Sequence, residues 1–298
     1  MKQAVLLLAH GAPEHAVDIG PYLTCVRCGK PLPPHVVEEI RRRYTLIGGG
    51  SPLLARTQEQ AEALEALLAE EGFPVKVYVG MRNWHPFIRE TMADIREDGV
   101  DRIIAICLAP QYSRLSVGLY IRRTQEARQE LGMETEIVWT KSLYDRPLLI
   151  DAFAEKLRPL LPASKVLFTA HSLPEKMIET SDPYESEARA TAEAVATRCN
   201  LANWDFAYQS QGMTGDRWLG PTVESRIDEY ARNGVADVVV APIGFVCDHI
   251  EIQYDVDVLF SNYAEQRGIR LRRTESLNAS PRFIAALAAV AREKLQVA

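Results

Sequence analysis

Short apolar runs alternate with helix-length amphipathic stretches along the whole chain. Stretches with a helical period, such as TQEQAEALEALLAEEG (57–72) and TVESRIDEYARNG (222–234), separate the apolar runs. This alternation is typical of parallel sheets that are covered by helices on both faces. The pattern predicts an α/β protein with two doubly wound halves, each with a four-stranded parallel sheet. The predicted strands are 4–9, 75–80, 102–110 and 136–140, then 165–170, 205–210, 237–245 and 269–276.

The length of the chain agrees with two halves. The 298 residues are enough for two domains of about 150 residues each. We place the boundary near YDRPLLID at 144–151, which gives an N-terminal domain over 1–145 and a C-terminal domain over 146–298. The last helix is expected to pack back on the first domain.

Two similar strand ends carry a histidine at the same point. AVLLLAHGAPE (4–14) ends its apolar run at His10, and KVLFTAHSLPE (165–175) ends its run at His171. Ligands of open parallel sheets bind beyond the carboxyl ends of the strands, so both histidines are expected to face one cleft between the domains. The alternative is that each is a turn residue, hydrogen-bonded to the backbone.

Acidic residues gather in PIGFVCDHIEIQYDVD (242–257), which follows another predicted strand. Asp248, Glu251 and Asp255 have the spacing that places three carboxylates on one face of a helix. With one imidazole from His171, these oxygen ligands suit Fe(II), Mn(II) or Zn(II) in an open site. The alternative is that the acids interact with the helix dipole and are otherwise solvated.

Composition narrows the class of protein. The chain is 47% apolar and 25% charged with a net charge of −6, which argues against a nucleic-acid-binding protein. No apolar run reaches the length of a membrane span, and the start lacks the pattern of a secretory signal, so we expect a cytoplasmic protein. Five cysteines are an odd number for a disulfide framework and are expected to be reduced.

Six motifs stand in one order along the chain: IGGGSPL (47–53), APQYS (109–113), FTAHSLPEK (168–176), WLGP (218–221), PIGFVCDHIE (242–251) and SLN (276–278). In order and spacing they resemble the ferrochelatases. The resemblance implies two Rossmann-like domains with a porphyrin cleft between them, haem biosynthesis, Fe(II) as a substrate and no organic cofactor. It also implies that His171 and Glu251 hold iron and accept the pyrrole protons, with Asp255 as a further metal ligand and proton exit, and that IGGGSPL forms part of the porphyrin-binding wall.

The segment 21–52 is short and polar, whereas members that act on protoporphyrin carry a longer apolar lip. It resembles the coproporphyrin III type, whose four propionates favour basic and hydroxyl partners. The resemblance implies five residues that contact the porphyrin: Arg27, Arg43, Tyr44, Ser51 and Tyr120. The alternative for each is that it is only a surface or packing residue. The alternative activity is a protoporphyrin IX ferrochelatase.

Three features depart from the family pattern. His10 stands where the family usually has Tyr or Met opposite the metal-delivering face, which makes a histidine axial ligand to haem iron a hypothesis. Cys25 and Cys28 form a C-x-x-C, but two thiols are too few for a structural zinc or an iron–sulfur cluster, so we expect no cluster. Leu259 replaces the last acid of the metal-binding helix in some relatives, which weakens a second metal site.

Two other functions remain as alternatives. A sirohydrochlorin or cobalt chelatase would share the fold, but the WLGP and DHIE motifs favour the iron branch. A non-catalytic haem-binding or haem-delivery protein would be expected to have lost His171 or Glu251, and both are present. The expected partners are a porphyrin and ferrous iron, with transient contact to neighbouring haem-pathway enzymes and no nucleic acid.

Overall fold

A computed structural model of the chain describes residues 1–212 and 216–295. Its internal contacts divide the chain into two compact units. Unit 1 comprises residues 1–109 and 114–142 together with the described residues from 278 onward, and unit 2 comprises residues 110–113 and 143–277. Each unit is built on one four-stranded sheet.

The sheet of unit 1 has four parallel strands in the order β2-β1-β3-β4. The central strands β1 and β3 are almost completely buried, as expected for runs of Val, Ile and Leu that are covered on both faces. All four strands expected in the first half of the sequence are confirmed. Their bounds are β1 (Gln3–Ala9), β2 (Lys76–Met81), β3 (Arg102–Cys107) and β4 (Glu136–Thr140).

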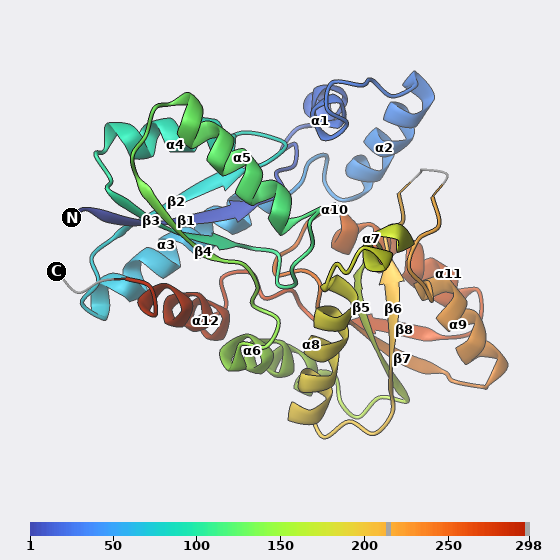
Figure 1. The fold of residues 1–298 in the computed structure, drawn as a ribbon. Helices are drawn as coiled ribbons and strands as arrows, with labels where there is room; N and C mark the ends of the chain where they lie inside the picture. Colours follow the sequence, from blue (N-terminus) through green and yellow to red (C-terminus); the bar gives the residue numbers. More distant parts are fainter. Residues whose placement is uncertain (213–215, 296–298) are drawn as a thin grey trace. The chain divides into compact units, whose positions relative to one another are not determined.

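Helices cover both faces of this sheet. In Figure 1, α4 and α5 lie on one side of the strands and α3 and α12 lie on the other. The C-terminal helix α12 packs against α3 within unit 1. The bounds are α3 (Leu53–Glu70), α4 (Ile88–Glu97), α5 (Val117–Glu130) and α12 (Pro281–Arg292).

The polar segment after β1 forms two further helices, which the hydrophobic pattern did not identify. A 3₁₀ turn (Ala16–Asp18) leads into α1 (Ile19–Val26), and α2 (Pro34–Leu46) follows. Pro34 stands at the first turn of α2, where proline favours helix initiation. Only Ile19 and Tyr22 of α1 and Tyr44 of α2 are buried, so neither helix shows a regular apolar stripe.

The sheet of unit 2 repeats the topology of unit 1. Its order is β6-β5-β7-β8, so in both sheets the first strand lies between the second and the third. The strands are parallel, and the four expected in the second half are confirmed. Their bounds are β5 (Lys165–His171), β6 (Trp204–Gln209), β7 (Asp237–Pro242) and β8 (Arg270–Arg273).

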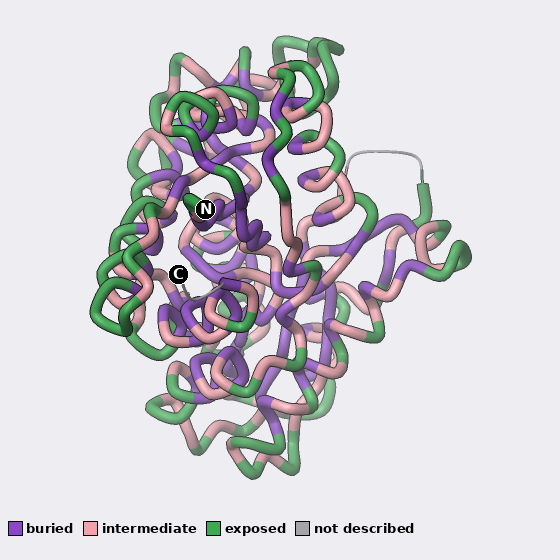
Figure 2. The backbone as a smooth tube through the Cα atoms, turned by 60° about the vertical axis from the view of Figure 1, so that its left-hand side comes forward, coloured by how far each residue is buried: buried purple, intermediate pink, exposed green. Residues whose placement is uncertain are grey.

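Helices also flank the second sheet, with α6 and α8 on one side and α9 and α11 on the other (Figure 1). Buried side chains of β5, β6 and β7 pack against α9 and the segment 250–264 in one apolar cluster. Figure 2 shows the buried stretches running through the interior, with exposed turns around them. The bounds are α6 (Pro147–Leu157), a 3₁₀ turn (Arg158–Leu160), α7 (Glu175–Glu179), α8 (Tyr184–Arg198), α9 (Val223–Arg232), α10 (Ile250–Gln253), a π-helix (Asp255–Phe260) and α11 (Ser261–Glu265).

Among the described helices, none combines the length and the apolar character that a bilayer crossing requires.

Candidate functional site

His171 is the last residue of β5, at the carboxyl end of the second sheet. Its Nδ1 lies against the carbonyl oxygen of Ser172, and because a carbonyl only accepts hydrogen bonds, Nδ1 carries the ring hydrogen. The neutral ring therefore presents a lone pair on Nε2. The main-chain carbonyl of His171 accepts a 2.8 Å hydrogen bond from the Tyr184 hydroxyl, which fixes the strand end. Burial raises the pKa of Tyr184, so it remains a donor.

Glu251 lies between two imidazoles in the first turn of α10. Its Oε2 is 3.7 Å from Nε2 of His171 and 4.0 Å from Nε2 of His249. His249 repeats the arrangement of His171, because its Nδ1 lies 2.9 Å from the Cys247 carbonyl and its ring packs on Phe245 at 4.8 Å. Two imidazoles thus direct their Nε2 atoms toward one carboxylate.

This arrangement is close to the spacing that a metal ion would need. Two donors that each bind a metal at about 2.1 Å with tetrahedral angles lie about 3.4 Å apart. The 3.7 Å between His171 and Glu251 is slightly longer. Within residues 1–212 and 216–295, no three side chains of the His, Cys, Asp and Glu types already form a metal site. A small movement of either side chain would bring the two donor atoms to the separation of two ligands on one metal ion.

Gln209 connects this site to the sheet. Its side chain is buried at the end of β6, where it accepts a 2.8 Å hydrogen bond from the Thr169 hydroxyl and donates a 2.8 Å bond to the Glu251 main-chain carbonyl. The Ser172 amide donates to the Gln209 carbonyl at 2.7 Å. One side chain thereby positions α10 against the strand that carries His171.

Asp255 begins the π-helix, one short turn beyond Glu251. Its Oδ2 accepts a hydrogen bond of 2.5 Å from the hydroxyl of Ser210, a residue held at a positive φ of 59° directly after β6. The helical segment is thus not a single α-helix, and π-helical turns are frequent at functional sites.

The expectation that Asp248 shares a helix face with Glu251 and Asp255 is wrong. Helix α10 starts at Ile250, and the preceding His249 is extended, with φ −164° and ψ −176°. Asp248 therefore lies before the helix, where it accepts a 2.7 Å hydrogen bond from Ser276. The segment therefore does not present three carboxylates on one helix face, and Glu251 is the one placed 3.7 Å from His171.

His10 directly follows β1, at the carboxyl end of the first sheet. Its Nδ1 lies 3.0 Å from the Gly11 carbonyl, and its Nε2 lies 3.0 Å from the side-chain nitrogen of Asn83. The hydroxyl of Tyr22, on α1, approaches Nδ1 at 3.4 Å, and Trp84 packs edge-to-face on Tyr22 at 6.1 Å. The structure thus contains the alternative interaction expected for His10, a hydrogen bond to a loop carbonyl. A bond from Nε2 to iron would require the Asn83 side chain to turn away.

Gly11 is required beside His10. It has φ 81°, and a Cβ there would lie 2.8 Å from the Trp84 amide nitrogen and 3.0 Å from Cβ of Met81. The loop that joins His10 to the rest of the chain therefore packs closely against the end of β2.

The five expected porphyrin contacts all lie in unit 1 but differ in exposure. Arg27 is exposed at the end of α1, and Arg43 is half-buried on α2 with Nε 3.2 Å from Glu39. Tyr44, Ser51 and Tyr120 are buried, with exposed fractions of 2%, 6% and 4%. The two arginines are therefore the accessible members of the set.

The glycine segment of IGGGSPL ends α2 and packs on the chain after β1. Gly48 and Gly49 have positive φ angles of 106° and 94°, and the Gly49 amide donates to the Tyr44 carbonyl at 2.8 Å. A Cβ on Gly50 would overlap the Glu14 carbonyl oxygen. These glycines allow a tight approach between the segment and the His10 loop.

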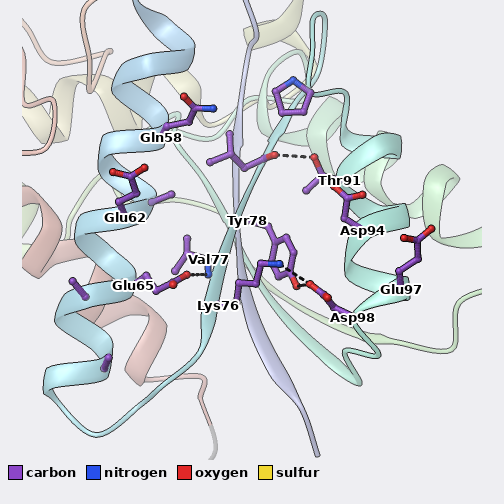
Figure 3. A pocket seen from close by; sticks show the side chains of 15 residues that line it. Gln58, Glu62, Glu65, Lys76, Val77, Tyr78, Thr91, Asp94, Glu97 and Asp98 are labelled. Carbon is purple, nitrogen blue, oxygen red and sulfur yellow. Dashed lines mark hydrogen bonds and ion pairs between the residues drawn. The ribbon is translucent and has the colours of Figure 1, made fainter.

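A cavity of about 900 Å³ lies elsewhere in unit 1, along the edge strand β2 (Figure 3). Glu65 accepts a 2.7 Å bond from the Val77 amide, and the Thr91 hydroxyl donates a 2.8 Å bond to the Val79 carbonyl. These side chains occupy hydrogen-bonding groups that an edge strand otherwise exposes. The cavity contains no histidine and lies along the strand rather than at its carboxyl end, so we do not assign the chemistry to it.

Sequence reasoning missed several residues that surround the His171–Glu251 pair and His10. His249 stands within the DHIE motif, two positions before Glu251, so its place next to the carboxylate had a visible signal. The buried amides gave no such signal, because an amide at a strand end is common in any α/β protein. The missed residues are Tyr22, Asn83, Tyr184, Gln209, Ser210 and His249.

Comparisons with known proteins match almost the whole chain to one family. The family model named Ferrochelatase matches residues 2–295. A ferrochelatase of Acidobacterium capsulatum is 44% identical, with 99% of this chain and 95% of the relative covered. A coproporphyrin III ferrochelatase of Geobacillus kaustophilus is 36% identical, with 96% of this chain and 94% of the relative covered.

Among solved structures, SirB from Bacillus subtilis with Fe³⁺ is similar, with a TM-score of 0.62 and 13% identity. The similarity covers 98% of this chain and 95% of SirB, and at this identity it supports the fold alone. The family model and the curated relatives identify the lineage, because they match almost the full length at much higher identity. The chain belongs to the ferrochelatase family.

Proposed function

We propose that this protein inserts Fe(II) into coproporphyrin III and so forms coprohaem in haem biosynthesis. The observation that carries the insertion reaction is the Nε2 of His171 facing Oε2 of Glu251 at 3.7 Å, at the carboxyl end of the second sheet. Three relatives that are 34–36% identical to this chain are named coproporphyrin III ferrochelatase, which supports this porphyrin. The polar segment with Arg27 and Arg43 supports it as well, because propionates favour guanidinium partners.

The proposed reaction needs a base that is neutral near pH 7. A free-base porphyrin loses two pyrrole protons as Fe(II) enters, and a neutral imidazole accepts a proton in this pH range. In our proposal His171 accepts the first proton on Nε2, since its Nδ1 already carries a hydrogen. The imidazolium then faces the carboxylate of Glu251, which stabilises the charge.

Glu251 has two roles in the proposal. With His171 it holds the incoming iron, since carboxylate and imidazole form a ligand set that Fe(II) accepts. It also receives protons from either imidazole, because His249 faces the same oxygen at 4.0 Å. Asp255 is the proposed next acceptor on the way to solvent and a further ligand to iron that approaches along the helix.

We propose a different task for His10, on the opposite face of the porphyrin. A neutral imidazole is a common axial ligand of haem iron. In the proposal, Nε2 exchanges the Asn83 amide for the inserted iron, and the bond slows release of the product. A ferric spectrum of the product complex that shows histidine ligation, and that His10→Ala loses while insertion continues, would support this task. The same spectrum in wild type and variant would contradict it.

A competition experiment tests the choice of porphyrin. Coproporphyrin III and protoporphyrin IX are offered separately and together with Fe(II) under anaerobic conditions, and insertion is followed in the Soret band. We expect a higher kcat/KM for coproporphyrin III, with the difference reduced in Arg27→Gln. Arg128→Gln, on α5, is a matched control that should retain the preference. A higher kcat/KM for protoporphyrin IX would contradict the choice of substrate but leave iron insertion standing.

A further inference from the structure

The C-x-x-C of the sequence lies in the C-terminal turn of α1. The Gly29 amide donates to the Thr24 carbonyl at 2.8 Å, and the Cys28 amide donates to the Cys25 carbonyl at 3.0 Å. These are the two bonds of a Schellman motif, whose left-handed residue is usually glycine. Here Cys28 holds that position with φ 53°. A cysteine therefore occupies a position where the backbone favours glycine, and such local strain is often associated with function.

The same turn brings the two cysteines together. Cys25 and Cys28 are the first and fourth residues of a hydrogen-bonded turn, and Arg27, with φ −94° and ψ 19°, has the third-residue geometry of type I. Such turns bring the outer Cα atoms to within about 7 Å, and disulfides span about 4.4–6.8 Å. The backbone is thus already near the separation that a disulfide requires.

Both thiols are exposed and line one cavity of about 480 Å³. Its charged lining consists of four arginines and three glutamates: Arg82, Arg89, Arg122 and Arg123, with Glu90, Glu126 and Glu130. Arg82 donates to the Leu115 carbonyl at 3.1 Å and stacks on the Tyr120 ring at 5.2 Å. Within the described chain, no carboxylate forms an ion pair with Arg82, so its charge is available to an anionic ligand.

The remaining cysteines are less suited to thiol chemistry. Cys107 and Cys247 are buried, and burial raises the pKa of the Cys107 thiol. Cys199 is half-buried, and burial raises its pKa as well. The exposed pair is therefore where an external disulfide can reach a sulfur atom.

We propose that Cys25 and Cys28 are a redox pair that exchanges with low-molecular-weight disulfides carrying carboxylates, which the cavity binds through Arg82. One thiolate attacks the external disulfide, forms a mixed disulfide and releases one external thiolate. The other cysteine then attacks the protein sulfur, closes the Cys25–Cys28 disulfide and releases the second external thiolate. The pair loses two electrons and two protons, and the external disulfide gains the electrons.

Oxidation has a consequence for the porphyrin site, which rests on the proposed function. Arg27 lies between the two cysteines and is a proposed propionate contact. A disulfide would restrain the backbone on both sides of Arg27, so the redox state would alter the KM for porphyrin more than kcat. The test below reads masses of the protein without porphyrin, so it is independent of iron insertion.

The experiment treats the reduced full-length protein with excess glutathione disulfide at pH 7.5, followed by alkylation and peptide mass spectrometry. We expect a Cys25–Cys28 disulfide in wild type, while Cys107, Cys199 and Cys247 remain alkylated. With Cys28→Ser or Cys25→Ser, the remaining cysteine is expected to keep the glutathione mixed disulfide in at least one variant. Complete alkylation of both cysteines in wild type would overturn the proposal.

The role of the cavity in binding the external disulfide is tested by removing the positive charge of Arg82. Arg82→Gln should slow oxidation by glutathione disulfide roughly tenfold, the loss of one charge-assisted contact, and leave oxidation by neutral hydroxyethyl disulfide unchanged. Arg96→Gln is the matched control, because Arg96 also donates to a main-chain carbonyl but lies outside the cavity. Equal rates with glutathione disulfide in wild type and Arg82→Gln, or an equal loss in Arg96→Gln, would overturn recognition by the cavity.

Discussion

Replacing Gln209 by leucine should damage the proposed iron site without touching any proposed ligand. The change removes two hydrogen bonds of 2.8 Å, from the Thr169 hydroxyl and to the Glu251 carbonyl, and leaves the fully buried Thr169 hydroxyl without this acceptor. Two bonds of about 1 kcal/mol each, plus the unsatisfied groups, give a loss of about 2–4 kcal/mol in the free energy of unfolding. Because α10 loses its anchor, a shift of Glu251 by about 1 Å should lower kcat about 10- to 100-fold.

Thr169→Val distinguishes the effect on the free energy of unfolding from the effect on the position of Glu251. It removes only the hydroxyl, so the bond from Gln209 to α10 remains, and we expect a loss of about 1–2 kcal/mol with kcat changed less than about threefold. Gln129→Leu, on the exposed face of α5, should stay within about 0.5 kcal/mol of wild type. Urea unfolding and Soret kinetics measure the two effects. A wild-type kcat in Gln209→Leu, or equal kcat losses in the Gln209 and Thr169 variants, would refute the reasoning.

Four further substitutions test other parts of the molecule. His171→Ala should lower kcat at least about 100-fold, and Glu251→Gln about 10- to 100-fold, while fluorescence quenching shows porphyrin binding nearly intact; normal insertion by His171→Ala would exclude it as the base. Asn83→Leu removes the donor to Nε2 of His10, so the histidine-ligated fraction of the ferric product should rise, and an unchanged spectrum would count against ligation. Asp98→Asn should lower Tm at neutral pH, because hydrogen bonds from Lys76 and Tyr78 lower the pKa of Asp98 in the folded state. That contribution is present above the unfolded value of about 3.9 and is lost as pH falls through the lower folded value, so a Tm difference that does not shrink as the pH is lowered into the acid range would contradict it.

The strands were predictable from the sequence, whereas helices α1 and α2 were not. Runs such as AVLLLA and RIIAIC are buried on both faces, and continuous burial leaves a continuous apolar signal. Helices α1 and α2 bury only Ile19, Tyr22 and Tyr44 between them, so no stripe of helical period appears. Their ends are instead set by local features, such as Pro34 at the start of α2.

The candidate site was predictable where its chemistry is carried by rare residue types at a strand end. His171 met this condition, whereas Glu251 was singled out by the DHIE motif, and the structure brings the two side chains to 3.7 Å. The misplaced Asp248 shows the limit of periodicity, because spacing assumes a continuous helix and cannot detect an extended residue such as His249. Gln209 was not predictable, since its role depends on which strands are neighbours.

The two repeated histidines share one local structure, and in our proposal they have different chemical tasks. His10 and His171 both follow or end the first strand of a sheet, and both direct Nδ1 to the carbonyl of the next residue. Each neutral ring therefore has the same tautomer, with its lone pair on Nε2. The two rings differ in the partner of Nε2. The Asn83 amide donates a hydrogen bond to the lone pair on Nε2 of His10, whereas the Glu251 carboxylate faces Nε2 of His171 and would stabilise a proton added there. In our proposal this one difference makes His171 the residue that accepts protons and keeps His10 neutral, as a ligand to iron must be.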